Sequence, residues 1–103
     1  MTISRKITHT RPNTSVAWHN ETTDPTMSSI FKQVEDYIAA NYPGVNTVTV
    51  NVSGDGLTQT VVSDWSDDNA HASFTSTDLH NQYLQTVNTY YNSIGGARVA
   101  EIN

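Results

Sequence analysis

Alternating apolar and polar positions near the amino terminus predict a first strand. Residues 2 to 11 change side at every step, which is typical of an extended segment with two distinct faces. One of those faces carries Ile3, Arg5, Ile7 and His9. The segment Ser15 to Trp18 is again extended and apolar, so we expect it to continue the strand beyond a kink at Pro12.

A helix is predicted to begin at Asp24 and Pro25. The Asp24 carboxylate can accept a hydrogen bond from a free backbone N–H, and Pro25 has no N–H to leave unpaired. Apolar residues then recur at helical spacing along one stripe: Met27, Ile30, Phe31, Val34, Ile38 and Tyr42. The sequence Tyr42-Pro43-Gly44 is predicted to end this helix.

A period of two returns after Gly44 and predicts a hairpin. Val48, Val50 and Val52 share one face of the first strand. Ser53-Gly54-Asp55-Gly56 then predicts a reversal into a second strand, Leu57 to Trp65. Val62 lies on the face opposite Trp65, so the second face of the sheet is partly apolar.

Two more helices and a last strand follow. Ser66 or Asp67 is expected to cap a short helix that ends near Phe74, and residues 76–78 to cap a longer one. The longer helix carries one apolar stripe: Leu79, Tyr83, Val87, Tyr90, Tyr91 and Ile94. Gly95-Gly96 is predicted to end it, and residues 97–102 to form the last strand.

The resulting order β-α-β-β-α-β favours an α+β, ferredoxin-like fold with a four-stranded antiparallel sheet and two helices on one face. With 103 residues, the chain is expected to form a single domain, residues 1–103. The uncovered face should carry Trp18, Val62 and Val99 and bind a second subunit, giving a homodimer or higher homo-oligomer with a small pocket between facing sheets.

Composition narrows the functional classes. The absence of Cys excludes disulfides, thiolate metal sites and a cysteine nucleophile, and a net charge of −5 argues against nucleic acid as a partner. No apolar run approaches the roughly 18 residues of a membrane span, and residues 1–14 show no secretory signal, so we expect a cytoplasmic protein without membrane partners. The Thr- and Asn-rich, Lys-poor composition is similar to that of many small phage proteins, which would place it in a host cytoplasm.

Few residues suggest a catalytic or ligand-binding role. Trp65 can stack on a planar ligand or pack beneath a helix, and packing is the favoured interpretation. The candidate ligand-binding residues are Trp65, Phe74 and Trp18. No catalytic residue, metal ligand or cofactor is assigned, and the nature of any small-molecule ligand stays open.

Charged and ionisable residues have simpler expected roles. The four histidines, whose spacing does not suit a metal site, are expected at the surface: His9, His19, His71 and His80. Asp64, Asp67 and Asp68 lack the glycine and distal Glu of a calcium loop, so helix capping explains them. Three cations near the amino terminus are expected on a solvated strand edge, with a docking strip for an acidic partner as the alternative: Arg5, Lys6 and Arg11.

Four residues with the spacing W-x4-A-x3-F-x3-D carry a family resemblance: Trp65, Ala70, Phe74 and Asp78. Over residues 45 to 102 the chain resembles the dimeric α/β barrels of the antibiotic-biosynthesis monooxygenase type, which include haem-degrading enzymes. The position of the axial His of those haem-degrading relatives is Leu84 here, and His80 lies four residues earlier, so haem is not expected. Cofactor-free relatives use a Trp, which Trp65 matches, and an Asn for which the first strand offers no match.

Two functional hypotheses follow. The main interpretation is a self-associating, non-catalytic interaction or assembly module. The alternative is a cofactor-independent monooxygenase, or a binder of a small aromatic molecule, with its pocket near Trp65. An enzyme needs a cavity there with convergent polar groups, whereas the assembly module predicts a space filled by Phe31, Phe74 or Tyr91.

Overall fold

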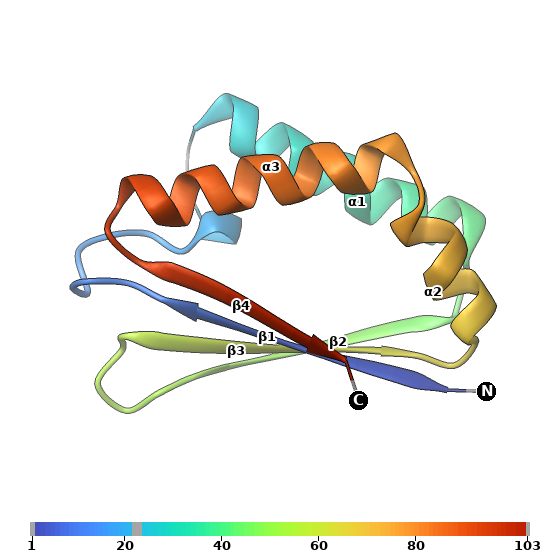
Figure 1. The fold of residues 1–103 in the computed structure, drawn as a ribbon, viewed down its shortest axis with the longest axis horizontal. Helices are drawn as coiled ribbons and strands as arrows, with labels where there is room; N and C mark the ends of the chain where they lie inside the picture. The colour runs from blue at the N-terminus through green and yellow to red at the C-terminus, as the bar shows by residue number, and fades with distance from the viewer. Residues whose placement is uncertain (1, 22–23, 103) are drawn as a thin grey trace.

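A computed structural model describes residues 2–21 and 24–102 of the chain, and it confirms the predicted order of strands and helices (Figure 1). The elements are β1 (Ile3–Thr10), the 3-10 turn η1 (His19–Glu21), α1 (Pro25–Asn41), β2 (Asn46–Val52), β3 (Thr58–Trp65), α2 (Asp68–Thr75), α3 (Asp78–Ser93) and β4 (Ala97–Ile102). This is the ferredoxin-like α+β arrangement. None of the helices in the described part is both long and apolar enough to cross a membrane.

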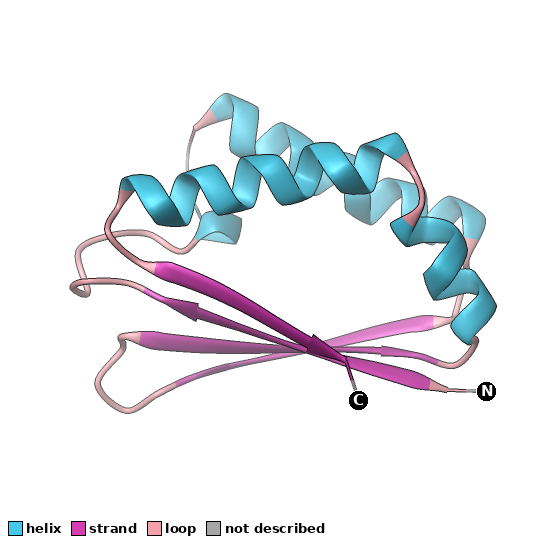
Figure 2. Cartoon of the chain, viewed as in Figure 1, coloured by secondary structure: helices cyan, strands magenta, loops and turns pink. Residues whose placement is uncertain are grey.

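The four strands form one antiparallel sheet in the order β2-β3-β1-β4. In the register of β1, Ile3 lies opposite Trp65, and Ile7 lies between Val61 of β3 and Ala100 of β4. All helices lie on one side of this sheet, with α1 and α3 side by side and α2 at one end (Figure 2). The inner face of the sheet therefore meets a helical layer, and no helix of the described residues covers the outer face (Figure 2).

Local capping explains where the helices begin. Asp24 accepts hydrogen bonds from the backbone N–H groups of Thr26 and Met27, at 2.8 and 3.3 Å. Asp67 caps α2 by accepting from the N–H of Asn69, and Thr77 caps α3 through its hydroxyl. All three predicted helix starts are thus confirmed, because each rests on contacts within a few residues.

The predicted extension of the first strand to Trp18 is wrong. The backbone N–H of Arg11 still bonds to the carbonyl of Leu57, but the side chain of Asn13 then accepts from the N–H of Ser15 and turns the chain. This turn brings Trp18 beneath α3, where it is 2% exposed and packs with Val87 and Tyr91. Trp18 consequently adds no surface to the outer face of the sheet.

The buried apolar residues form two clusters at opposite ends of β1. One consists of Val34, Trp65, Ala70 and Phe74, and the other of Trp18, Val87 and Tyr91. Ile3 packs on the first cluster, whereas His9 stacks on Tyr91 of the second. The middle of β1, with Arg5 and Ile7, lies between them, and this gap determines where a site can form.

The outer face of the sheet is mostly polar. Val62 is half-buried and Val99 is 54% exposed, while Lys6, Thr8 and Thr60 share this face. Val62 and Val99 thus lie where an outer-face interface was expected. Self-association through this face stays a prediction.

Gly96 supplies a test of the fold at the junction between α3 and β4. A Cβ at Gly96 would lie 2.1 Å from the carbonyl oxygen of Thr10, whereas one at Gly54 would meet nothing within 4 Å. We expect Gly96→Ala to lower the free energy of unfolding by about 2 kcal/mol, because backbone atoms must separate. Gly54→Ala is the matched control and should change it by less than about 0.5 kcal/mol. Urea unfolding of both variants measures the difference, and equal stabilities would contradict the close packing of β4 on β1.

Candidate active site

A cavity of about 520 Å³ lies between the helices and the inner face of the sheet. All four strands and the three α-helices contribute to its walls. Its polar side chains include Arg5, Glu35, Asn46, Ser63, His71, His80, Tyr83 and Arg98. Its apolar side chains include Ile7, Phe31, Val34, Ile38, Val48, Val61, Trp65 and Phe74. Polar groups from distant parts of the sequence thus converge beside Trp65.

Trp65 and Phe74 form an aromatic wall. Their rings are stacked, with centroids 5.7 Å apart and planes 22° from parallel. The indole N–H of Trp65 donates to the Ser63 hydroxyl at 3.1 Å, which fixes the ring from the sheet side. Trp65 is 3% exposed and also lines the cavity, so the packing role and the ligand-facing role expected from the sequence coexist.

The four histidines are buried, which corrects the expectation that they lie at the surface. They are between 2% and 7% exposed: His9, His19, His71 and His80. The sequence did carry a signal for two of them. His9 continues the alternation of Ile3 and Ile7, and His80 precedes Tyr83 by three residues, so each belongs to a buried stripe.

His71 and His80 are the histidines that line the cavity. The ring of His71 meets Trp65 edge-on at 5.5 Å, and the ring of His80 meets Phe74 edge-on at 5.2 Å. Nε2 of His71 and Nδ1 of His80 are buried and have no hydrogen-bond partner among the described residues. Burial, and then the positive charge of Arg5, lowers the pKa of both imidazoles, so they are neutral at pH 7 and able to accept a proton.

Arg5 and Arg98 face the same cavity from β1 and β4. This corrects the expectation of a solvated strip of cations, because the three amino-terminal cations separate. Lys6 points to the outer face, and Arg11 donates to the carbonyls of Gly56 and Val16, at 2.8 and 2.6 Å. The alternation of β1 places Arg5 on the same face as Ile3 and Ile7, which is the signal in the sequence for its inward position.

The other two histidines lie outside the cavity. Nδ1 of His9 is 2.9 Å from Oε1 of Gln59, and the His9 ring stacks on Tyr91 at 4.5 Å. His19 packs edge-on against Tyr83 and Tyr90. These contacts pack both rings against tyrosines of α3, and Nε2 of each is also buried without a hydrogen-bond partner among the described residues.

The expected ligand-binding residues separate in the same way. Trp65 and Phe74 line the cavity, whereas Trp18 packs in the cluster beneath α3, with the guanidinium of Arg11 4.2 Å from its ring centre. No group of three or more His, Asp or Glu side chains that could hold a metal ion occurs within the described residues.

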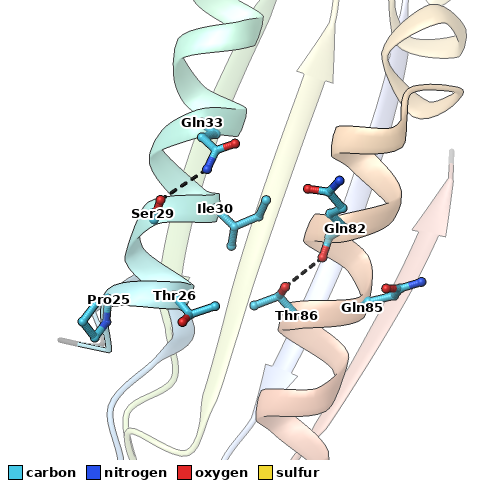
Figure 3. Close-up of a pocket in the computed structure, with 8 residues that line it drawn as sticks. All are labelled: Pro25, Thr26, Ser29, Ile30, Gln33, Gln82, Gln85 and Thr86. Atoms are coloured by element: carbon cyan, nitrogen blue, oxygen red, sulfur yellow. Dashed lines mark hydrogen bonds between the residues drawn. The ribbon is translucent and has the colours of Figure 1, made fainter.

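A second hollow lies between α1 and α3 (Figure 3). Its side chains are neutral, and several are already engaged within their own helix. Gln33 donates to the hydroxyl of Ser29 at 3.2 Å, and Thr86 donates to the carbonyl of Gln82 at 2.8 Å. Without an ionisable or aromatic residue in its lining, this hollow offers no chemistry comparable to that of the cavity.

No protein-family model and no curated protein matches the sequence. Solved structures do match the fold. SnoaB, a cofactor-independent oxygenase from Streptomyces nogalater, superposes with a TM-score of 0.61 and 11% identity, over 99% of this chain and 90% of that chain. A monooxygenase from the gene ActVA-Orf6 of Streptomyces coelicolor, in complex with Nanaomycin D, superposes with a TM-score of 0.64 and 15% identity. The match covers 98% of this chain and 84% of that chain.

A de novo designed protein with the ferredoxin fold, LFR1 1, also matches, with a TM-score of 0.52 and 11% identity over 98% of this chain and 85% of that chain. The comparisons therefore confirm the resemblance to the antibiotic-biosynthesis monooxygenase type at the level of fold. A fold of this kind does not specify an activity by itself. Evidence for an activity has to come from the cavity.

The expectation of a non-catalytic assembly module is overturned. The structural neighbours of the protein include monooxygenases, and the space beside Trp65 is a cavity with convergent polar groups. Phe31 and Phe74 line that space without filling it, and Tyr91 belongs to the other cluster. These findings favour the alternative hypothesis, a cofactor-independent monooxygenase or a binder of a small aromatic molecule with its pocket near Trp65.

The buried histidines predict that the protein loses stability in acid. Burial, and then the charges of His9 and Arg98, lowers the pKa of His19 to about 4 from its ordinary 6.5. The unfolded chain therefore binds this proton first, and stability present above pH 6.5 is lost as the pH falls toward 4, by at most about 3 kcal/mol for this residue. Urea unfolding between pH 7.5 and 4.5 should show the decline, and it should be shallower in His19→Gln. A variant with the same pH dependence as the parent would show that His19 is not buried in its neutral form.

Proposed function

We propose that the protein is a cofactor-independent monooxygenase that oxidises a planar aromatic substrate with dioxygen. The observation that carries this proposal is the cavity itself, where an aromatic wall of Trp65 and Phe74 stands beside two neutral histidines with unpaired ring nitrogens. The likeness in fold to SnoaB and to the Streptomyces coelicolor monooxygenase supports it.

The cavity has the size and lining of a small-molecule site. Such sites measure about 300 to 1,000 Å³ and combine apolar walls with a few polar groups. A volume of about 520 Å³ suits two or three fused rings with their substituents. The Trp65 and Phe74 rings, 3% and 5% exposed, close one apolar side of the cavity, where a ligand ring can pack against their edges.

His80 is proposed as the general base. Its unpaired Nδ1 can take a proton from an acidic ring CH2 of the substrate, and its lowered pKa keeps it neutral. The resulting carbanion is the reductant of dioxygen, which explains how the reaction proceeds without a cofactor. Carbon and oxygen bond to form a hydroperoxide. Loss of the second C–H proton then breaks the O–O bond, so that CH2 and O2 become C=O and water.

Anthrone is a suitable test substrate because its central CH2 is flanked by two aromatic rings and lies para to a carbonyl. We expect the protein to accelerate the conversion of anthrone and dioxygen to anthraquinone and water, measured by oxygen uptake and absorbance. Under 18O2 the product should gain one labelled oxygen. The acid limb of the rate profile should lie below pH 6.5, since the pKa of His80 is lowered.

Two substitutions distinguish a catalytic role of His80 from a role in folding. His80→Gln should reduce the rate by about 100-fold, because general base catalysis typically contributes at least that much. His19→Gln, which alters a buried histidine outside the cavity, is the control and should retain the parental rate at pH 7.5. Binding of anthrone without oxidation would refute the monooxygenase and leave a binder of aromatic molecules. Equal rates in the two variants would refute the role of His80.

A further inference from the structure

The cavity holds two positive charges without matching negative ones. Arg5 and Arg98 line it, and Glu35, the acidic side chain of the lining, is exposed and forms no salt bridge with either of them within the described residues. Across the described residues the salt bridge found is Lys32 with Asp36, on the surface of α1. A chain with a net charge of −5 thus places two of its five Lys and Arg residues in one cavity.

The guanidinium groups also have uncommitted donors. Nε of Arg5 and Nε of Arg98 are buried and have no hydrogen-bond partner in the structure. An unpaired buried donor is costly, and an unpaired buried charge more so, which is why most are satisfied in native proteins. Arg11 shows the ordinary arrangement, because its Nε donates to the carbonyl of Gly56 at 2.8 Å. Arg5 and Arg98 therefore keep donors that are free for a group that enters the cavity.

The residues around the arginines indicate the charge of such a group. Burial lowers the pKa of Arg5 and of Arg98, so a nearby anion would be favoured by both. The Tyr83 hydroxyl lies close enough to interact with both guanidiniums, and His80 feels both positive charges. Burial raises the pKa of Tyr83, so it is a neutral phenol that can donate a hydrogen bond but does not neutralise the arginines.

The spacing of residues along β1 shows where the two arginines lie relative to Trp65 and Phe74. Trp65 lies opposite Ile3, and Arg5 occupies the next inner-face position, roughly 7 Å further along the strand. Arg98 lies opposite His9 on the other side of β1, further along in the same direction. A ring held at Trp65 would thus direct a substituent toward Arg5 and Arg98.

We propose that the substrate is an anion, a planar aromatic molecule whose oxyanion is held by Arg5 and Arg98 while its rings lie against Trp65 and Phe74. The Nε–H and adjacent N–H of a guanidinium form a donor pair that fits a carboxylate, and the same pair can bind an ionised enol. This inference rests on the proposed function, since it names the substrate class of the same cavity.

Matched ligands test the charge directly. 2-Naphthoate and naphthalene-2-carboxamide have the same rings and nearly the same shape, but only the first carries a charge. Titration calorimetry at pH 7.5 should show that 2-naphthoate binds at least 10-fold more tightly than the amide. The ionised 2-hydroxy-1,4-naphthoquinone distinguishes the two possible sources of the oxyanion. If it binds more tightly than 2-naphthoate, the oxyanion of the substrate is an enolate. If it binds more weakly, the oxyanion is a carboxylate.

Matched variants test which cations of the protein bind the anionic ligand. Arg5→Gln and Arg98→Gln should each weaken 2-naphthoate binding at least 10-fold and leave amide binding unchanged. Lys6→Gln is the control, because it removes a cation from the same strand on the opposite face and should bind 2-naphthoate as the parent does. Without ligand, the melting temperatures of the arginine variants should equal or exceed the parental value, because each variant loses a half-buried cation that has no salt bridge within the described residues. A role of the arginines in folding would instead lower those temperatures.

The outcomes separate this inference from the proposed function. Equal affinity for naphthoate and the amide, or equal loss in Lys6→Gln and Arg98→Gln, overturns the anion site. Oxidation of anthrone that 2-naphthoate does not inhibit also overturns it, while the monooxygenase stands. Binding of 2-naphthoate that depends on Arg5 and Arg98, in a protein that binds anthrone without oxidising it, supports the anion site and refutes the oxygenase.

Discussion

The structure depends on the separation of its apolar core into two clusters. The Trp65 and Phe74 cluster and the Trp18 and Tyr91 cluster hold the helices on the sheet at its two ends. Between them the inner face carries Arg5 where a fully packed sheet would carry an apolar residue. Long polar side chains cannot form a dry core there, so the two layers remain apart and a cavity persists.

This arrangement places function and stability in opposition. His71, His80, Arg5 and Arg98 all have buried nitrogens without partners, and each lowers the stability of the empty protein. Burial keeps the histidines neutral, which a general base requires, and it leaves the arginines with unused donors, which an anion binder requires. Such costs are typical of binding and catalytic sites, whose groups are arranged for a ligand.

The fold could be predicted from the sequence because its signals are local. Asp24, Asp67 and Thr77 cap helices through neighbouring N–H groups, and the change of hydrophobic period at Gly44 marks the first hairpin strand. The site was predicted only in part. The sequence predicts Trp65 and Phe74 as candidates, but polar residue types favour the surface for His71, His80 and Arg5, and only the tertiary packing shows that they line a cavity. Arg98 is brought to the site by pairing of β4 with β1, a contact across most of the chain.

The central claim is that the middle of the interface between helices and sheet is an open, cationic cavity. The chain has three arginines, so nuclear magnetic resonance of the side-chain Nε–Hε groups yields three signals that report on it separately. On addition of 2-naphthoate, the account predicts that the Arg5 and Arg98 signals shift while the Arg11 signal, already bonded to Gly56, stays in place. Unchanged Arg5 and Arg98 signals at saturating ligand, or a shift confined to Arg11, would contradict it.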